Sequence, residues 1–380
     1  MHRKAAPQGK VPSSVTIQQE RPPLVDCDVH PLVKSVESIY PYVSSSWRRH
    51  FETRGARMYA RARDRYNHPN RTYRMDAVPE SGGPAGSDRD FTLEDHMTPF
   101  GVASALLLPQ EPYGVTTWSD PSAAGAFCSG VNDYFLETWV DYDSRFNLAI
   151  SVSPHDPQLA AQEIRRRGGE IGVIGVQLML NEQMMGSRWF DPVYQAACEM
   201  NLPIVLHQTG NEGCYTTSQG PSGGVPRSYG ERHVVLTQVG AANVVDMITN
   251  GAFERFPTLR VVMVEWGFSW LSSLLPRMDF LWENDPDAAP LVKKLPSAYV
   301  AEHFTFTTQP LDEPDTRDEL QSLFRIPNIE KMLLFSSDYP HYDTDDPDFV
   351  IKRIPETMRT RVCFENAVNV FGDKVLRSTP

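Results

Sequence analysis

The chain has 380 residues, of which 41% are hydrophobic and 22% are charged, and its formal net charge is −12. This composition is ordinary for a globular protein that buries a large core. The negative charge argues against nucleic acid or another polyphosphate as a partner, because such binding depends on basic surface. A small anionic substrate is still compatible with it, because such a ligand responds to the local field in a cleft.

The cysteines and the N-terminal segment indicate the cellular compartment. No CxxC pair is present, so neither a disulfide framework nor a thiolate zinc site is expected. Residues 1–23 are rich in Pro, Gln, Ser and basic residues and lack the apolar segment of a secretory signal. We therefore expect a disordered tail there, a cytoplasmic protein and no contact with a membrane, since no apolar run approaches about 20 residues. The cysteines are scattered: Cys27, Cys128, Cys198, Cys214 and Cys363.

Short apolar runs alternate with helical patterns from residue 24 onward. Strands are expected over residues 24–30, 102–108, 147–153, 172–180, 202–208, 260–265, 302–308 and 331–338. Helices are expected over residues 121–142, 156–168, 191–201 and 238–254, the second and third of which open with Asp-Pro. The alternation predicts an α/β fold, a single-domain (β/α)8 TIM barrel over residues 24–375, with a doubly wound sheet as the competing architecture.

An Arg-rich insertion over residues 47–90 follows the first expected strand. Residues 47–74 contain nine arginines against Glu52 and Asp64, and residues 81–88 resemble a flexible loop. In a barrel this insertion lies at the catalytic face. It is either a solvated helix or dimer contact, or a lid whose Arg71 or Arg74 binds a substrate carboxylate.

Four candidate metal ligands lie at the ends of three expected strands. Asp28 and His30 are two residues apart on the first strand, so they share one face. His207 ends the fifth strand and Asp338 ends the eighth. A carboxylate after Leu-Leu-Phe is costly to bury without a cation or several donors. Because the carboxyl ends of barrel strands converge, these four side chains predict a divalent metal site.

Further residues at the same end are candidates for chemistry or substrate binding. Glu265 ends the sixth strand at the depth of the metal ligands, and His341 lies in the loop beyond Asp338, where it can touch a substrate. Aromatic and methionine side chains in loops after strands could line a pocket, although ordinary packing explains each equally well: Tyr113, Trp118, Met184 and Trp189.

Taken together, these motifs resemble the amidohydrolase superfamily, in the branch that contains aminocarboxymuconate-semialdehyde decarboxylase and its amidohydrolase 2 relatives. The resemblance covers about residues 24–372 and implies a TIM barrel that binds one divalent ion. It also implies a homodimer. No Lys ends the fourth strand, so a carbamylated lysine bridging two metals is not expected. The matching residues are Asp28-Val29-His30, His207, Glu265-Trp266-Gly267, Trp270, Arg277-Met278-Asp279, Ser337-Asp338-Tyr339-Pro340-His341, Phe364-Glu365-Asn366-Ala367 and Phe371-Gly372.

The chain departs from the decarboxylases of this branch at one position, where Glu265 replaces their strand-six His. We therefore expect first a hydrolase that cleaves a small amide, lactone or related ring compound with a metal-activated water. Asp338 would accept the water proton, Glu265 would act as a second acid or base, and His341 would stabilise the oxyanion. Zinc is the expected ion, with Mn, Fe or Co compatible.

Two alternatives remain at this stage. The first is a metal-dependent, non-oxidative decarboxylase of an aromatic or unsaturated carboxylic acid. The second is an inactive barrel that serves as an interaction subunit.

Overall fold

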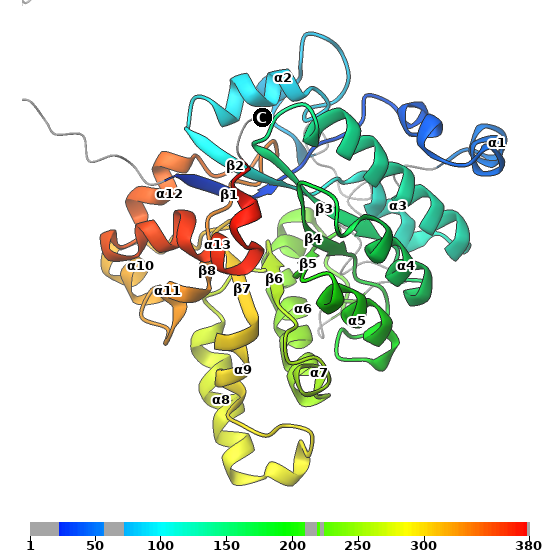
Figure 1. Ribbon diagram of the computed structural model, residues 1–380. Helices are drawn as coiled ribbons and strands as arrows, with labels where there is room; N and C mark the ends of the chain where they lie inside the picture. The colour runs from blue at the N-terminus through cyan, green and yellow to red at the C-terminus, as the bar shows by residue number, and fades with distance from the viewer. Residues whose placement is uncertain (1–22, 57–71, 210–218, 221–223, 378–380) are drawn as a thin grey trace, which may run out of the picture.

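The computed structural model describes residues 23–56, 72–209, 219–220 and 224–377. Eight parallel strands form one sheet in sequence order, β1 to β8, with helices around it (Figure 1). The sheet curls into a barrel, and backbone bonds close it: Cys27 N donates to Phe335 O, and His30 N donates to Tyr339 O. The strands are β1 Leu24–Val29, β2 Val102–Leu107, β3 Phe146–Val152, β4 Val173–Leu178, β5 Ile204–His207, β6 Val261–Val264, β7 Phe304–Thr307 and β8 Leu333–Leu334.

All eight expected strands are present, and the (β/α)8 barrel is confirmed. Their residues are almost all buried, because a parallel barrel is covered by side chains inside and by helices outside. The eighth strand is shorter than the expected 331–338. Residues 329–332 form a helical turn, and the ladder ends at Leu334 although Asp338 N still donates to Asp28 O at 3.1 Å.

Several helices begin at a residue whose side chain accepts a bond from one of the first free backbone N–H groups. Asp120 and Asp156 cap α3 and α4, and each is followed by Pro at the first helical position. Helix α6 begins at Tyr229, not at the expected residue 238, because Ser228 caps it. The helices are α1 Ser45–Arg54, α2 Arg89–Thr92, α3 Pro121–Phe135, α4 Pro157–Arg167, α5 Asp191–Glu199, α6 Tyr229–Thr249, α7 Ala252–Arg255, α8 Leu271–Asn284, α9 Pro296–His303, α10 Arg317–Leu323, α11 Ile329–Met332, α12 Pro347–Arg353 and α13 Asn366–Phe371.

One end of the barrel is closed by the C-terminal part of the chain. Phe371 of α13 and Val375 belong to the same buried cluster as the inward residues of the strands, which include Val25, Ile174 and Val262. Asn147 Nδ2, on β3, donates to Val375 O at 3.1 Å. Since the described C-terminal residues fill this end, the carboxyl ends of the strands are the side on which a ligand is expected, as in other barrels of this type.

The Arg-rich insertion is described only in part. Helix α1 lies well away from the barrel axis (Figure 1), and its Arg48 forms an exposed ion pair with Glu52. Arg71 and residues 1–22 of the tail expected over residues 1–23 lie outside the described residues.

A buried glutamate joins the first two loops at the carboxyl end of the barrel. Glu111 follows β2, at the start of the 3-10 helix Glu111–Thr117, and its Oε1 accepts a bond from Val33 N in the loop after β1. The side chain is fully buried, and this burial raises the pKa of Glu111 from 4.5 to about 7. A carboxyl group in this position is easier to bury protonated than ionised.

The raised pKa predicts a pH-dependent stability. The folded chain holds this proton more tightly than the unfolded chain, so the stabilisation is complete below pH 4.5 and is lost as pH rises through 7. We expect Glu111→Gln to remove about 3 kcal/mol of pH dependence from the free energy of unfolding, measured by urea denaturation between pH 4.5 and 9. The exposed Glu182→Gln is the control. Parallel curves for wild type and Glu111→Gln would contradict the assignment.

Candidate metal centre

The first two expected ligands meet at the end of β1. His30 Nε2 lies 2.9 Å from Asp28 Oδ1, and both side chains are fully buried. The other ring nitrogen, Nδ1, lies 2.9 Å from the carbonyl oxygen of Leu108, which can only accept. The proton of a neutral ring is therefore assigned to Nδ1, and the lone pair of Nε2 faces the carboxylate.

His207 ends β5 and repeats this arrangement. Its Nδ1 donates to the carbonyl oxygen of Gln208, so its Nε2 faces the interior of the barrel. That Nε2 lies 3.1 Å from Glu265 Oε2 and 3.9 Å from Asp28 Oδ1. Metal-binding histidines in proteins are usually oriented by such a bond from the second ring nitrogen.

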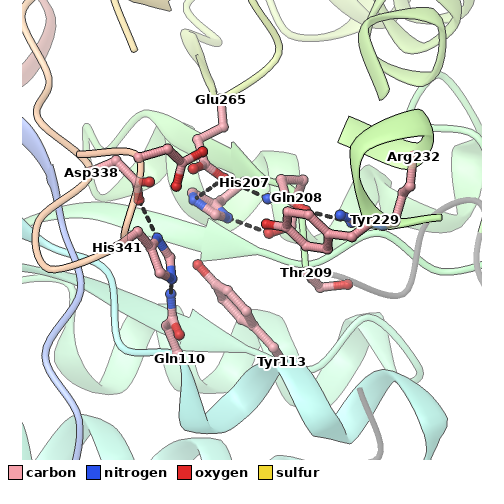
Figure 2. Close-up of a pocket in the computed structure, with 11 residues that line it drawn as sticks. Gln110, Tyr113, His207, Gln208, Thr209, Tyr229, Arg232, Glu265, Asp338 and His341 are labelled. Carbon is pink, nitrogen blue, oxygen red and sulfur yellow. Dashed lines mark hydrogen bonds and ion pairs between the residues drawn. The ribbon is translucent and has the colours of Figure 1, made fainter. Parts of the chain in front are cut away.

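Asp338 and His341 lie on the loop after β8 and complete the cluster (Figure 2). Asp338 Oδ1 lies 3.1 Å from His30 Nε2 and 2.5 Å from His341 Nδ1. The Gln110 amide nitrogen can only donate, and it lies 2.8 Å from His341 Nε2. His341 therefore accepts at Nε2 and donates from Nδ1 to Asp338, which leaves neither nitrogen free for an ion.

The charges of the cluster are not balanced by the side chains alone. Burial and the nearby carboxylates of Glu265 and Asp28 raise the pKa of Asp338 well above its ordinary value. Burial lowers the pKa of His207, but the Glu265 carboxylate outweighs it and raises that pKa to about 9. Both shifts show that three buried carboxylates attract additional positive charge.

A divalent cation fits this excess of negative charge and the orphaned atoms around it. Among the described residues, Asp28 Oδ1 and Oδ2, His30 Nε2 and His207 Nε2 are buried without a hydrogen-bond partner. One ligand atom each from Asp28, His30, His207 and Glu265 lie within 4.8 Å of one another, and a second such group contains His30, Glu265, Asp338 and His341. Buried polar atoms left unpaired in this way are costly, and a bound ion removes the cost.

The cluster opens into a pocket with a largely polar wall (Figure 2). Tyr113 stacks on His207 with ring centroids 5.3 Å apart, and its hydroxyl accepts a bond from Gln177 at 2.9 Å. Burial, with the nearby Asp28, Glu265 and Asp338, raises the pKa of Tyr113, so the phenol stays protonated. The pocket is lined by Gln110, Tyr113, His207, Gln208, Thr209, Tyr229, Arg232, Glu265, Asp338, His341 and Asp343.

Most of the site residues expected from the sequence come together here, but two of the expected substrate contacts do not. Arg74 forms ion pairs with Asp76 and Asp95 and does not line the pocket. Trp118 packs on Phe51 and Phe127, also away from the pocket. The residues brought together are Asp28, His30, His207, Glu265, Asp338 and His341.

Sequence reasoning missed several residues of the pocket wall, among them Gln110, Gln208 and Arg232. Gln110 and Gln208 each lie just beyond the end of a strand, which was the available signal. Arg232 lies in the first turns of α6, a part that was not expected to be helical. The Ser228-x-x-Glu231 pattern of a helix N-terminus could have indicated it.

No helix within the described ranges has the length and apolar character needed to cross a membrane.

The chain is similar to known proteins in both sequence and fold. The curated gamma-resorcylate decarboxylase of Polaromonas sp. strain JS666 is 23% identical over 319 residues, which is 77% of this chain and 92% of the relative.

Two solved structures share the fold. An amidohydrolase from Mycobacterium avium subsp. paratuberculosis has a TM-score of 0.68 at 20% identity, covering 93% of this chain and 100% of its own. The 5-carboxyvanillate decarboxylase of Novosphingobium aromaticivorans, complexed with manganese and 4-hydroxy-3-methoxy-5-nitrobenzoic acid, has a TM-score of 0.66 at 18% identity, with 93% and 97% covered. A family model described as Amidohydrolase matches residues 25–372. The chain therefore belongs to the amidohydrolase family.

Proposed function

We propose that the chain is a metal-dependent decarboxylase of a hydroxylated aromatic carboxylic acid. The observation that carries this proposal is the buried cluster of potential cation ligands beside the Asp338–His341 pair, at the carboxyl ends of the barrel strands. Two of the relatives are named as aromatic acid decarboxylases, and one aligns over 92% of its length. The comparisons thus favour the alternative derived from the sequence over the hydrolase that was expected first.

The residues around the cation site suit a planar acid. Asp28, His30, His207 and Asp338 would hold the ion, and their carboxylate and imidazole donors suit Mn, Fe, Co or Zn. When bound, the ion supplies a Lewis acid that can chelate a carboxylate and a neighbouring hydroxyl oxygen. The buried ring of Tyr113 offers an aromatic wall beside it.

The Asp338–His341 pair is placed to supply the proton that the reaction needs. In decarboxylation the electron pair of the broken carbon–carbon bond stays on the ring carbon, which then takes a proton as carbon dioxide leaves. His341 Nδ1 holds a proton against Asp338 Oδ1. Behind it Gln110 donates to His341, and Tyr73 donates to Gln110 Oε1 at 2.5 Å. This chain of bonds fixes the imidazole in a donating orientation.

Manganese is the ion that we propose, in place of the zinc expected from the sequence. Each group of potential ligand atoms pairs two carboxylates with two imidazoles and contains no thiolate, and carboxylate donors suit manganese. The relative solved with an aromatic acid contains manganese.

The first test is decarboxylation by the manganese-loaded protein. We expect hydroxybenzoic acids, among them 2,6-dihydroxybenzoate and 5-carboxyvanillate, to release carbon dioxide. In heavy water, one deuterium should enter the product at the carbon that lost the carboxylate. Chelator treatment should abolish the release, and added Mn²⁺ should restore it. Lactone or amide cleavage without carbon dioxide would support the hydrolase and overturn the proposal.

A second test concerns the proton donor. Replacing His341 with Asn removes the group that donates to Asp338, so we expect kcat to fall on the order of 100-fold or more. The metal content, measured by elemental analysis, should not change, because both nitrogens of His341 already have hydrogen-bond partners. The exposed His50→Asn is the matched control. Wild-type kcat in His341→Asn would remove this residue from the mechanism.

A further inference from the structure

Glu265 lies inside the ligand cluster and not beside it. Its Oε2 is 3.1 Å from His207 Nε2, and its side chain is almost fully buried. It is the one residue besides His30 that belongs to both groups of potential ligand atoms found in the described part of the chain. In Figure 2 its carboxylate points toward His207 and Asp338.

The contact between Glu265 and His207 is not an ordinary hydrogen bond when the imidazole is neutral. The His207 proton is directed to the Gln208 carbonyl from Nδ1, so a lone pair on Nε2 faces a lone pair on Glu265 Oε2. Two acceptors at 3.1 Å repel each other unless a positive charge lies between them. Either a second proton on His207 or a shared cation supplies that charge.

The Gln208 amide favours the ionised form of the Glu265 carboxylate. A guanidinium can only donate, so Arg232 Nη2, 2.5 Å away, requires the oxygen of the amide to face it. The amide nitrogen then faces Glu265 Oε2 at 2.7 Å and donates to it. Since the orientation of Gln208 is fixed at both ends, Oε2 must accept, and a donated bond to the charged form stabilises the carboxylate.

The backbone conformation of Glu265 is also constrained. Its φ is 64°, a left-handed conformation that is unfavourable for a residue with a side chain. Its backbone N–H donates to Thr307 Oγ1 at 3.1 Å, and this bond holds residue 265 against the end of β7. Strain of this kind, on the order of 1–3 kcal/mol, persists where the surroundings fix the conformation, and it is common at functional sites.

From this geometry we infer that Glu265 binds the metal ion directly, as the third carboxylate of a shell that also contains His30, His207, Asp28 and Asp338. Gln208 and Arg232 are positioning residues that hold the carboxylate in place. Three carboxylates exceed the charge of a divalent ion by one, and the buried Arg232 offsets that excess through Gln208. Glu265 then has no role as the acid or base that the sequence suggested. The inference rests on the metal site of the proposed function, but not on its reaction.

Manganese affinity tests this assignment without reference to turnover. Binding of Mn²⁺ to the metal-free protein is followed by equilibrium dialysis and by the electron paramagnetic resonance signal of free Mn²⁺. Replacing Gln208 with Leu should weaken binding by about 10- to 100-fold, as is usual for residues that support a ligand. Arg232→Met should have a similar effect, and Glu265→Gln should weaken binding more than either.

Glu182→Gln is the control, because it removes the same charge from an exposed side chain that belongs to neither ligand group. Its affinity for Mn²⁺ should stay close to that of the wild type. Circular dichroism measures whether each variant folds. If Glu265→Gln does not fold, Glu265→Asp replaces it. The affinity of Glu265→Asp for Mn²⁺ should lie between those of the wild type and Glu265→Gln. Wild-type affinity in Glu265→Gln with lost turnover would make Glu265 an acid or base and overturn the inference. A wild-type protein that binds no divalent ion would overturn the proposed function as well.

Discussion

The site depends on the direction in which two imidazole protons point. His30 and His207 each donate from Nδ1 to a backbone carbonyl, that of Leu108 and that of Gln208. Both lone pairs are therefore directed at buried carboxylates, where they repel unless a second proton or a cation lies among them. The barrel makes this costly arrangement permanent, because the two carbonyls belong to rigid strand ends. A bound ion would remove this repulsion.

Another buried carboxylate, Asp26, connects the first and last strands beneath the site. Its two oxygens accept bonds from Asp28 N, Ser337 N and Ser337 Oγ, and His96 Nε2 lies 2.8 Å from it. These bonds fix the backbone on both sides of the barrel seam, where β8 has only two ladder residues. Asp28 and Asp338 are thus held in register by side-chain bonds in place of a longer strand pairing.

Much of the fold could be predicted because barrel strands are short, apolar and separated by capped helices. The Asp28-x-His30 spacing and a carboxylate after Leu-Leu-Phe also indicated the cation site, since both patterns follow from strand geometry and desolvation. Arg74 could not be placed in the same way, because its partners Asp76 and Asp95 depend on a loop without periodic pattern. Arg232 reaches the site only through the first turns of α6, whose sequence is largely polar.

Under the proposed function, one wall of the pocket would bind the cation and the other would handle the proton. On one wall Arg232, Gln208 and Glu265 form a series in which every hydrogen points toward the Glu265 carboxylate, so the remaining lone pairs of this carboxylate can accept a cation. On the other wall Tyr73, Gln110 and His341 form a series that ends in a donated proton on Asp338. Asp338 belongs to both walls, since Oδ1 lies 3.1 Å from His30 Nε2 and also accepts from His341. A substrate held between the walls would thus meet an electrophile on one side and an acid on the other, which is what protonation of a ring carbon with loss of carbon dioxide requires.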